Sequence, residues 1–244
     1  MRIPRFYFSS DLSLGARVAL DKDAAHHAVR VLRMNEGDAV SLFNGDDHLY
    51  GASITRITKQ EVMVLIQSRT AASRESALSV LLAQGIAAGE RMDFVLQKAV
   101  ELGVTAIQPL QTERSVVKLQ GERKEKRAQH WQNLVIAACE QCGRNVVPAV
   151  LPILDLSSWL GQRDTMPALR IMLAPQADQA LRELPKPGGL IQLAVGPEGG
   201  FSAQENAALV QCGFTPARLG PRVLRTETAA LAALASLQTL WGDF

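Results

Sequence analysis

Strand-like and helix-like segments alternate along the last two thirds of the chain, and this rhythm constrains the fold more than any other feature. The apolar run LSVLLA at 78–83 precedes a helical pattern of apolar residues over 92–102, which Gly103 ends. Strand-like AIQPL at 106–110 precedes a helix of about 20 residues that reaches Gly143. Further strands are expected at 149–153, 169–174, 190–195 and 217–219, with helices from Ser202 and at the C-terminus. The pattern predicts an α/β domain with a buried parallel sheet.

The first 70 residues have a different rhythm. β-branched and aromatic runs predict short strands at 6–8, 40–43, 52–57 and 62–66. Asp23 is expected to cap a short helix through Leu32, and Asn44-Gly45 supplies a hairpin turn. The small, polar stretch Thr70–Ser76 is typical of an interdomain connection. We therefore expect a small β-barrel-like domain over 1–72 and an α/β domain over 73–244.

Composition and cysteine usage narrow the class of protein. Of the 244 residues, 47% are hydrophobic, which is enough for a large core, and the net charge of +2 neither requires nor excludes a polyanionic partner. We find neither the apolar core of a signal peptide nor an apolar run of membrane-spanning length, so a cytoplasmic location is expected. Cys139 and Cys142 form a C-x-x-C pair without further ligands, so we expect no metal and reduced thiols.

The segment VGPEGGFSAQE, from Val195 to Glu205, is a glycine-rich junction between a strand and a helix. Its three glycines let the main chain approach a ligand closely, which suits adenine, ribose or phosphate. Ser202 and Glu205 have capping-box spacing. Neither G-x-G-x-x-G nor a phosphate loop is present, and Glu198 would repel a triphosphate, which disfavours dinucleotide binding and ATP hydrolysis. A tight turn that serves topology alone is the alternative.

A second loop, LGPRVLRTETAA, runs from Leu219 to Ala230. A Gly-Pro turn leads into the terminal helix, which Thr226 or Thr228 could cap. Arginines 218, 222 and 225 lie within eight residues beside the glycine turn, which favours contact with an anion or a base over mere capping.

These two loops resemble the C-terminal signature loops of the SPOUT superfamily of RNA methyltransferases. Along nearly its whole length the chain is similar to the ribosomal RNA small subunit methyltransferase E family, which methylates N3 of a uridine in 16S rRNA. MRIPRFY, HHAVRVLRMNEGD, KAVELGV and AACEQCGRN also match, whereas 155–190 offer little to match. The resemblance implies S-adenosyl-L-methionine as cofactor, a trefoil knot in the C-terminal domain, a PUA- or OB-like N-terminal domain that binds RNA, and a homodimer formed through the knotted domains.

The resemblance also implies site residues. Those expected to bind the cofactor are Leu173, Gly196, Pro197, Glu198, Gly199, Gly200, Leu219, Gly220, Leu224, Thr226 and Thr228. Arg225 is expected to contact the target base or a flanking phosphate and to stabilise negative charge on the uracil carbonyls. Glu227 and Glu198 are the candidate general bases, although either could hydrogen-bond backbone or ribose instead.

A basic surface for docking of 16S rRNA, or of the small ribosomal subunit, is expected mainly on the N-terminal domain. Its candidate residues are Arg2, Arg5, His26, His27, Arg30 and Arg33, joined by Arg222 from the second loop. The alternative is that these are solvated charges and capping histidines.

Two rival functions remain open at this stage. One is a SPOUT methyltransferase that acts on tRNA or on a ribose 2′-hydroxyl with the same cofactor loops. The other is an RNA-binding ribosome-assembly protein without catalysis, which would have no need of two intact glycine loops. Binding of S-adenosyl-L-methionine distinguishes the second rival from an enzyme.

Overall fold

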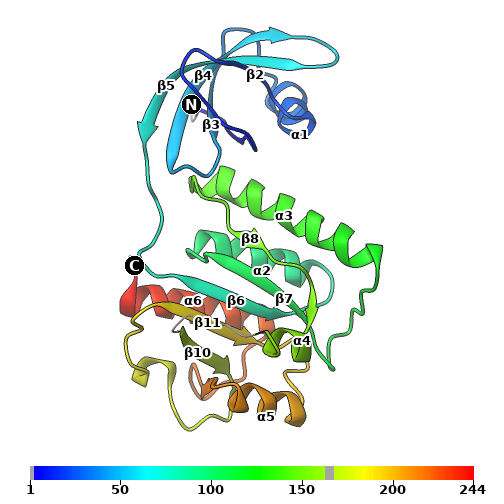
Figure 1. The fold of residues 1–244 in the computed structure, drawn as a ribbon, viewed down its shortest axis with the longest axis vertical. Coiled ribbons are helices and arrows are strands. Elements are labelled where there is room, and N and C mark those ends of the chain that lie inside the picture. Colours follow the sequence, from blue (N-terminus) through cyan, green and yellow to red (C-terminus); the bar gives the residue numbers. More distant parts are fainter. Residues whose placement is uncertain (1–2, 163–167) are drawn as a thin grey trace. The chain divides into compact units, whose positions relative to one another are not determined.

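A computed structural model describes residues 3–162 and 168–244 (Figure 1). Arg2, one of the expected RNA-binding residues, lies outside this described part. The chain divides into two compact units. The first comprises 1–75 together with 139–147, and the second comprises 76–138 together with 148–244. Each unit is described by itself.

The first unit is built on a five-stranded sheet in the order β1-β3-β4-β5-β2. The strands are β1 (Arg5–Tyr7), β2 (Arg17–Ala19), β3 (Ala39–Phe43), β4 (His48–Ile57) and β5 (Val62–Ala71). The turn at Asn44-Gly45 joins β3 and β4 as an antiparallel hairpin, as expected, with Gly45 at a φ of 95°. Alternate residues of β4 and β5, such as Ile54 and Val64, are buried in one core, which is the period-2 pattern of a sheet with one covered face. The expected small β domain is thus present, and β2 is a strand that the sequence patterns did not reveal.

The short helix of this unit differs from its expected form. α1 (Lys22–His26) begins two residues earlier than expected, because Asp21 and not Asp23 caps it by accepting a hydrogen bond from Ala24 N at 2.7 Å. The chain then continues as a single π-helical stretch, η1 (His27–Val31). It ends where Met34 N donates to Ala28 O, with Arg33 in the left-handed region at a φ of 54°. Arginine therefore occupies a position that usually favours glycine.

The segment 139–147 forms hydrogen bonds with residues of the outer strand β1. Tyr7 N donates to Glu140 Oε1 at 3.0 Å. The Arg5 guanidinium donates to the carbonyl of Arg144 at 2.9 Å and to Asn145 Oδ1 at 2.8 Å. Because these bonds satisfy an edge strand with side chains and carbonyls from another segment, the AACEQCGRN motif has a structural role in this unit.

The C-x-x-C pair lies at the end of α3 (Glu122–Cys142), the long helix that was expected to reach Gly143. Both cysteines are free thiols, and Cys139 is fully buried. Burial raises the pKa of the Cys139 thiol to about 12. Because a thiolate is the reactive form, this cysteine is inert at neutral pH. Among the described residues, no group of three or more His, Cys, Asp or Glu side chains could hold a metal ion.

The second unit contains a parallel sheet in the order β12-β10-β11-β6-β7-β8, with β9 paired to β7, which confirms the predicted α/β class. Its strands are β6 (Val80–Gly85), β7 (Ala106–Gln111), β8 (Ala149–Val150), β9 (Leu154–Asp155), β10 (Ala168–Leu173), β11 (Leu190–Val195) and β12 (Thr215–Ala217). Two expectations were wrong. The strand expected at 217–219 lies at 215–217. Of the strand expected at 149–153, only 149–150 form β8, and β9 begins at Leu154, beyond Pro152, which has no N–H to donate.

Helices cover both faces of this sheet (Figure 1). They are α2 (Glu90–Glu101), most of α3, α4 (Leu156–Leu160), α5 (Ala203–Gln211) and α6 (Thr226–Trp241), with a 3₁₀ turn η2 at Leu181–Glu183. The helices α4 and α5 pack on one face through Trp159 and Leu209, in one buried cluster with Ala83, Met172 and Ala194 of the strands. The neighbouring strand residues point to the other face, where α2 and α6 lie against each other. Among the described residues, no helix is long and apolar enough to span a bilayer.

The buried carboxylate of Glu140 makes the stability of the first unit depend on pH. Burial raises the pKa of Glu140 above its ordinary value of 4.5, and the hydrogen bond from Tyr7 N only partly offsets this effect. The folded state therefore holds the proton more tightly than the unfolded state, so this carboxylate lowers the stability as the pH rises above about 4.5. We expect the stability of Glu140→Gln, measured relative to that of the native chain, to increase as the pH is raised from about 5 to about 7.

Chemical denaturation at the two pH values, followed by circular dichroism, measures this difference. Glu122→Gln, at the exposed start of α3, is the matched control and is expected to show no such gain. A stability difference for Glu140→Gln that is the same at both pH values would contradict the assignment.

Candidate functional site

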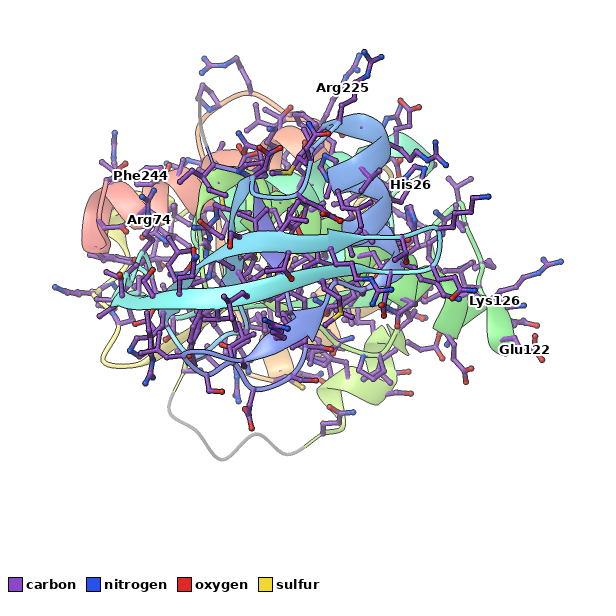
Figure 2. The ribbon with its side chains drawn as sticks, turned by 90° about the horizontal axis from the view of Figure 1, so that it is seen from above. His26, Arg74, Glu122, Lys126, Arg225 and Phe244 are labelled. Carbon is purple, nitrogen blue, oxygen red and sulfur yellow. The ribbon has the colours of Figure 1, made fainter. Side chains whose placement is uncertain are left out.

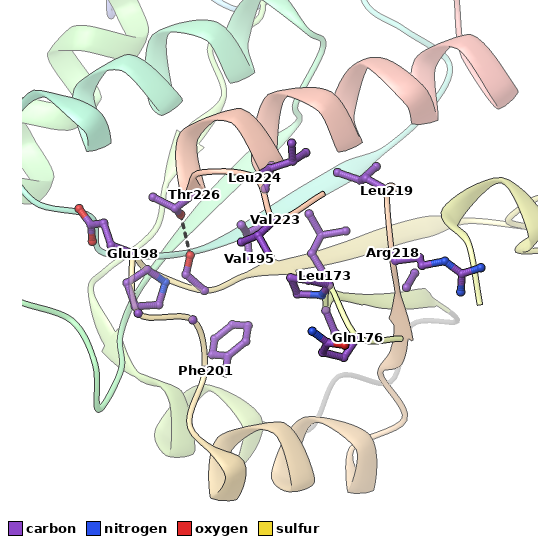
Figure 3. A pocket seen from close by; sticks show the side chains of 18 of the residues that line it. Leu173, Gln176, Val195, Glu198, Phe201, Arg218, Leu219, Val223, Leu224 and Thr226 are labelled. Atoms are coloured by element: carbon purple, nitrogen blue, oxygen red, sulfur yellow. Dashed lines mark hydrogen bonds between the residues drawn. The ribbon is translucent and has the colours of Figure 1, made fainter. Parts of the chain in front are cut away.

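A cavity of about 380 Å³ opens where the carboxyl ends of β10, β11 and β12 meet the start of α6 (Figure 3). Open parallel sheets bind their ligands at this edge. Most of the predicted cofactor residues line the cavity, namely Leu173, Gly196, Pro197, Glu198, Gly199, Gly200, Leu219, Gly220, Leu224 and Thr226. The two glycine-rich loops, which residues 201–218 separate in the sequence, therefore form one site.

The glycine loop, residues 196–200, is packed too closely for side chains at key points. A Cβ on Gly196 would stand 2.9 Å from main-chain atoms of Gly200 and Phe201. Gly200 has a φ of 66°, and its N–H donates to Pro197 O at 2.8 Å, which closes a tight turn. The glycines are thus required by close main-chain approach and by a left-handed backbone, as the sequence suggested. The turn leads directly into α5, whose expected capping box of Ser202 and Glu205 is confirmed.

Thr226 joins the second loop to the first. Its hydroxyl donates to the carbonyl of Gly196 at 2.6 Å, the bond drawn in Figure 3, and accepts a hydrogen bond from Gln84 Nε2 at 3.0 Å. Both Thr226 and Gln84 are buried. The expectation that Thr226 or Thr228 caps α6 was wrong, because Arg225 is the N-cap residue and makes no side-chain capping bond. Thr226 is the first residue of the helix, and its side chain serves the glycine loop instead.

The Glu198 carboxylate is engaged by two donors. Its Oε1 accepts from Ala88 N at 2.8 Å and from Arg91 Nη1 at 2.9 Å. Partial burial acts to raise its pKa, but these hydrogen bonds and the charge of Arg91 outweigh burial and hold the pKa of Glu198 below its ordinary value of 4.5. Because a lowered pKa makes the carboxylate a weaker base, a structural role for Glu198 is favoured over a role as proton acceptor.

The walls of the cavity are mainly apolar. Leu173, Val195 and Leu224 surround its interior, and Phe201 lies toward α5 (Figure 3). Apolar walls beside exposed main-chain groups suit a flat heterocycle held by hydrogen bonds to its edge. The sequence reasoning missed several lining residues, namely Arg114, Gln176, Val195, Phe201, Asn206 and Val223. The position of Arg114, three residues beyond the end of β7 on the ligand-binding edge, is the signal that could have revealed it.

Of the proposed reacting residues, Glu198 lines the cavity, whereas Arg225 and Glu227 do not. Arg225 is exposed, and Figure 2 shows its side chain extending away from the ribbon. Glu227, in the first turn of α6, is partly buried, and its Oε2 has no hydrogen-bond partner among the described residues. Thr228 is exposed and also lies outside the lining.

The expected RNA-binding residues are placed differently from one another. Four of them are exposed and lie on one short segment of the chain. They are His26 in α1, His27 and Arg30 in η1, and Arg33, two residues after η1. Figure 2 labels His26 on this helical segment. Arg222, on the second loop, is exposed and lines the cavity, whereas the guanidinium of Arg5 has partners inside its own unit. A structural role for Arg5 follows from those bonds.

Comparison with known proteins agrees with this geometry. Residues 74–238 match the model of an RNA methyltransferase domain, and residues 20–67 match that of an RNA methyltransferase PUA domain. The ribosomal RNA small subunit methyltransferase E of Buchnera aphidicola subsp. Schizaphis graminum is 36% identical over 242 residues, covering 99% of this chain and 98% of the relative.

Solved structures extend the likeness to the fold. A ribosomal RNA small subunit methyltransferase E from Neisseria gonorrhoeae, bound to S-adenosyl methionine, is 42% identical with a TM-score of 0.92. A protein from Legionella pneumophila, in complex with the bound cofactor SAM, is also 42% identical, with a TM-score of 0.94. Each comparison covers 100% of both chains. On these matches, the chain belongs to the ribosomal RNA small subunit methyltransferase E family.

Proposed function

We propose that this chain transfers a methyl group from S-adenosyl-L-methionine to N3 of a uridine in 16S rRNA of the small ribosomal subunit. The observation that carries the proposal is the single cavity formed by the two glycine-rich loops. The names of the relatives favour small-subunit rRNA over tRNA as the acceptor. The choice of uridine N3 over a ribose hydroxyl comes from the resemblance of the signature loops.

The residues of the cavity fit this cofactor. Its volume lies within the range of about 300 to 1,000 Å³ that is typical of small-molecule sites. Gly196, Gly199 and Gly200 bring main-chain N–H and C=O groups to the surface, and Leu173 and Leu224 supply an apolar wall for adenine. When bound, S-adenosyl-L-methionine supplies an electrophilic methyl group on a positively charged sulfur.

Protein groups must then align the acceptor and manage one proton. Transfer forms the bond between N3 and the methyl carbon, leaves the sulfur neutral and releases the N3 proton. Of the two candidate bases, Glu227 suits this task better, because the two donors to Glu198 lower its pKa and make it a weaker proton acceptor, whereas Glu227 Oε2 has no hydrogen-bond partner among the described residues. Arg225 is exposed beside the cavity, where its permanent charge would stabilise negative charge on the uracil carbonyls or hold a phosphate.

The two domains would divide the work. We place RNA docking on residues 1–72, through His26, His27, Arg30 and Arg33, and methyl transfer on residues 73–244. The exposed basic segment around η1 supports the docking role. π-Helical turns and non-glycine residues in the left-handed region are enriched at functional sites.

Three further features belong to the proposal. We infer a homodimer formed through the C-terminal domain, the trefoil knot that the superfamily resemblance implies, and action in the cytoplasm where ribosomal subunits are made.

Gly196 provides the sharpest test of cofactor binding. The Cβ of Gly196→Ala would stand 2.9 Å from backbone atoms of the next turn, so the glycine loop must move. We expect at least about a tenfold loss of affinity for S-adenosyl-L-methionine in isothermal titration. Gly188→Ala, where no atom lies within 4 Å of the added Cβ, is the matched control. Native-like affinity in the Gly196 variant, with folding verified by circular dichroism, would disprove this site.

The proton acceptor can be identified from pH–rate profiles of single-turnover methylation of small ribosomal subunits. Glu227→Gln is expected to lower the rate by about a hundredfold and to remove the limb of the profile that reports the base. Glu198→Gln is expected to keep that limb, because its carboxylate is engaged by Ala88 and Arg91. If instead Glu227→Gln leaves the profile unchanged, Glu227 is not the base.

A substitution at Arg33 is expected to affect thermal stability and RNA binding in different directions. A left-handed backbone costs a non-glycine residue about 1 kcal/mol, so Arg33→Gly is expected to keep or raise the melting temperature. The same change is expected to weaken rRNA binding and to reduce the salt slope of the affinity by about 1. Lys59→Ala, an exposed change on the turn after β4, is the control. An unaltered salt slope in Arg33→Gly would place the docking surface elsewhere.

A further inference from the structure

We propose that Arg91 and Arg114 are positioning residues that hold the glycine loop, residues 196–200, in its binding shape before the cofactor arrives. This inference rests on the proposed function of the cavity. It concerns two arginines that neither the loop motifs nor the apolar walls include.

The topology of the sheet brings three separate segments to the glycine loop. Arg91 lies in the first turn of α2, which follows β6, and Arg114 lies just beyond β7. The glycine loop itself follows β11. Because β11, β6 and β7 are neighbouring parallel strands, their carboxyl ends share one edge of the sheet. Both arginines are thus supplied from segments that follow strands of the central sheet.

Arg91 fixes the middle of the glycine loop through Glu198. Its Nη1 lies 2.9 Å from Glu198 Oε1, and the same oxygen accepts from Ala88 N at 2.8 Å. The Glu198 side chain is 23% exposed and that of Arg91 is 49% exposed. The Ala88 N–H comes from the segment between β6 and α2, and the guanidinium comes from the first turn of α2, so together they tie the glycine loop to the start of this helix.

Arg114 fixes the next residue through the main chain. Its Nη1 donates to Gly199 O at 2.8 Å. Its Cβ and Cδ lie 3.1 Å and 3.3 Å from the point where a Cβ on Gly199 would stand, so the stem of the side chain covers the bare face of that glycine. The stem of Arg114 therefore explains why residue 199 is a glycine, in addition to the close approach of the proposed cofactor.

A loop with three glycines in five residues has many accessible conformations in water. If only a fraction of the molecules hold the binding shape, the apparent dissociation constant rises by the inverse of that fraction. External bonds at Glu198 and Gly199 raise the fraction before binding, and this lowers the entropy lost when the ligand is bound. Exposed ion pairs contribute little to global stability, so the effect should appear in affinity and not in the melting temperature.

The test uses Arg91→Gln, Arg114→Gln and the double variant of the full chain, with Arg123→Gln on the exposed start of α3 as control. Hydrogen exchange of residues 196–201 in the cofactor-free protein reports the order of the glycine loop. Isothermal titration with S-adenosyl-L-methionine, without RNA, reports the consequence for binding. We expect faster exchange and about a tenfold weaker affinity in each single variant, with a melting temperature close to that of the native chain.

Two further comparisons separate positioning from general structural damage. Arg114→Lys can still donate to Gly199 O and is expected to restore much of the affinity. In Glu198→Gln, the added Arg91→Gln change is expected to cause little further loss, because the two side chains act as one pair. The KM for the cofactor should rise more than kcat falls.

The outcomes distinguish this inference from the proposed function. Native-like exchange at 196–201 in both arginine variants would overturn the positioning role, as would unaltered cofactor affinity. Absence of saturable cofactor binding by the native chain would overturn the proposed function instead, and the exchange measurement would still report whether the arginines order the glycine loop.

Discussion

The hydrogen bond from the Thr226 hydroxyl to the carbonyl of Gly196 connects the parts on which the site depends. It fastens the start of the last helix to the glycine loop that follows β11, and Gln84 from β6 supports the same hydroxyl from behind. These three residues come from segments 30 and 142 positions apart in the chain. Because all three lie at the carboxyl edge of one sheet, a short polar chain in an otherwise apolar interior can define where the two loops meet.

Most of the charged side chains described at the edge of the site form hydrogen bonds within the protein. Glu198 accepts from Ala88 and Arg91, and Arg114 donates to the main chain of Gly199. Arg218, the first arginine of the second loop, donates to the carbonyls of Ala177 and Asp178. By contrast, Arg222 and Arg225 are exposed at the same edge. Arginines close together in sequence thus differ in their surroundings, because Arg218 is bonded within the fold whereas Arg222 and Arg225 are exposed.

Much of this organisation was readable from the sequence. Helix ends at Gly103 and Gly143, the Asn44-Gly45 hairpin and the capping box at Ser202 depend on local chemistry, and the structure confirms all four. The loops at 196–200 and 219–224 were found because glycines mark close backbone approach and because both match a family signature.

What escaped prediction depends on tertiary contacts. The direction of the Thr226 side chain, toward a carbonyl instead of its own helix, is set by the neighbouring loop. Arg91 and Arg114 lie in segments whose local patterns give only a helix start and a strand end, and their role follows from strand order. The short strand β2 lacks a clear apolar alternation, since it is held by pairing with β5. No local rule contains these long-range relations.

The residues 139–147 belong to the N-terminal unit, although the chain on either side of them belongs to the other. Their bonds to Arg5, Tyr7 and Ala72 mean that the N-terminal unit is completed by the end of α3. Excision at residue 75 would leave Glu140 and Asn145 without these partners. The two units are therefore not independent modules along the chain. A protein that gained or lost the N-terminal unit would also need a different sequence at the end of α3, inside the segment that encodes the other unit.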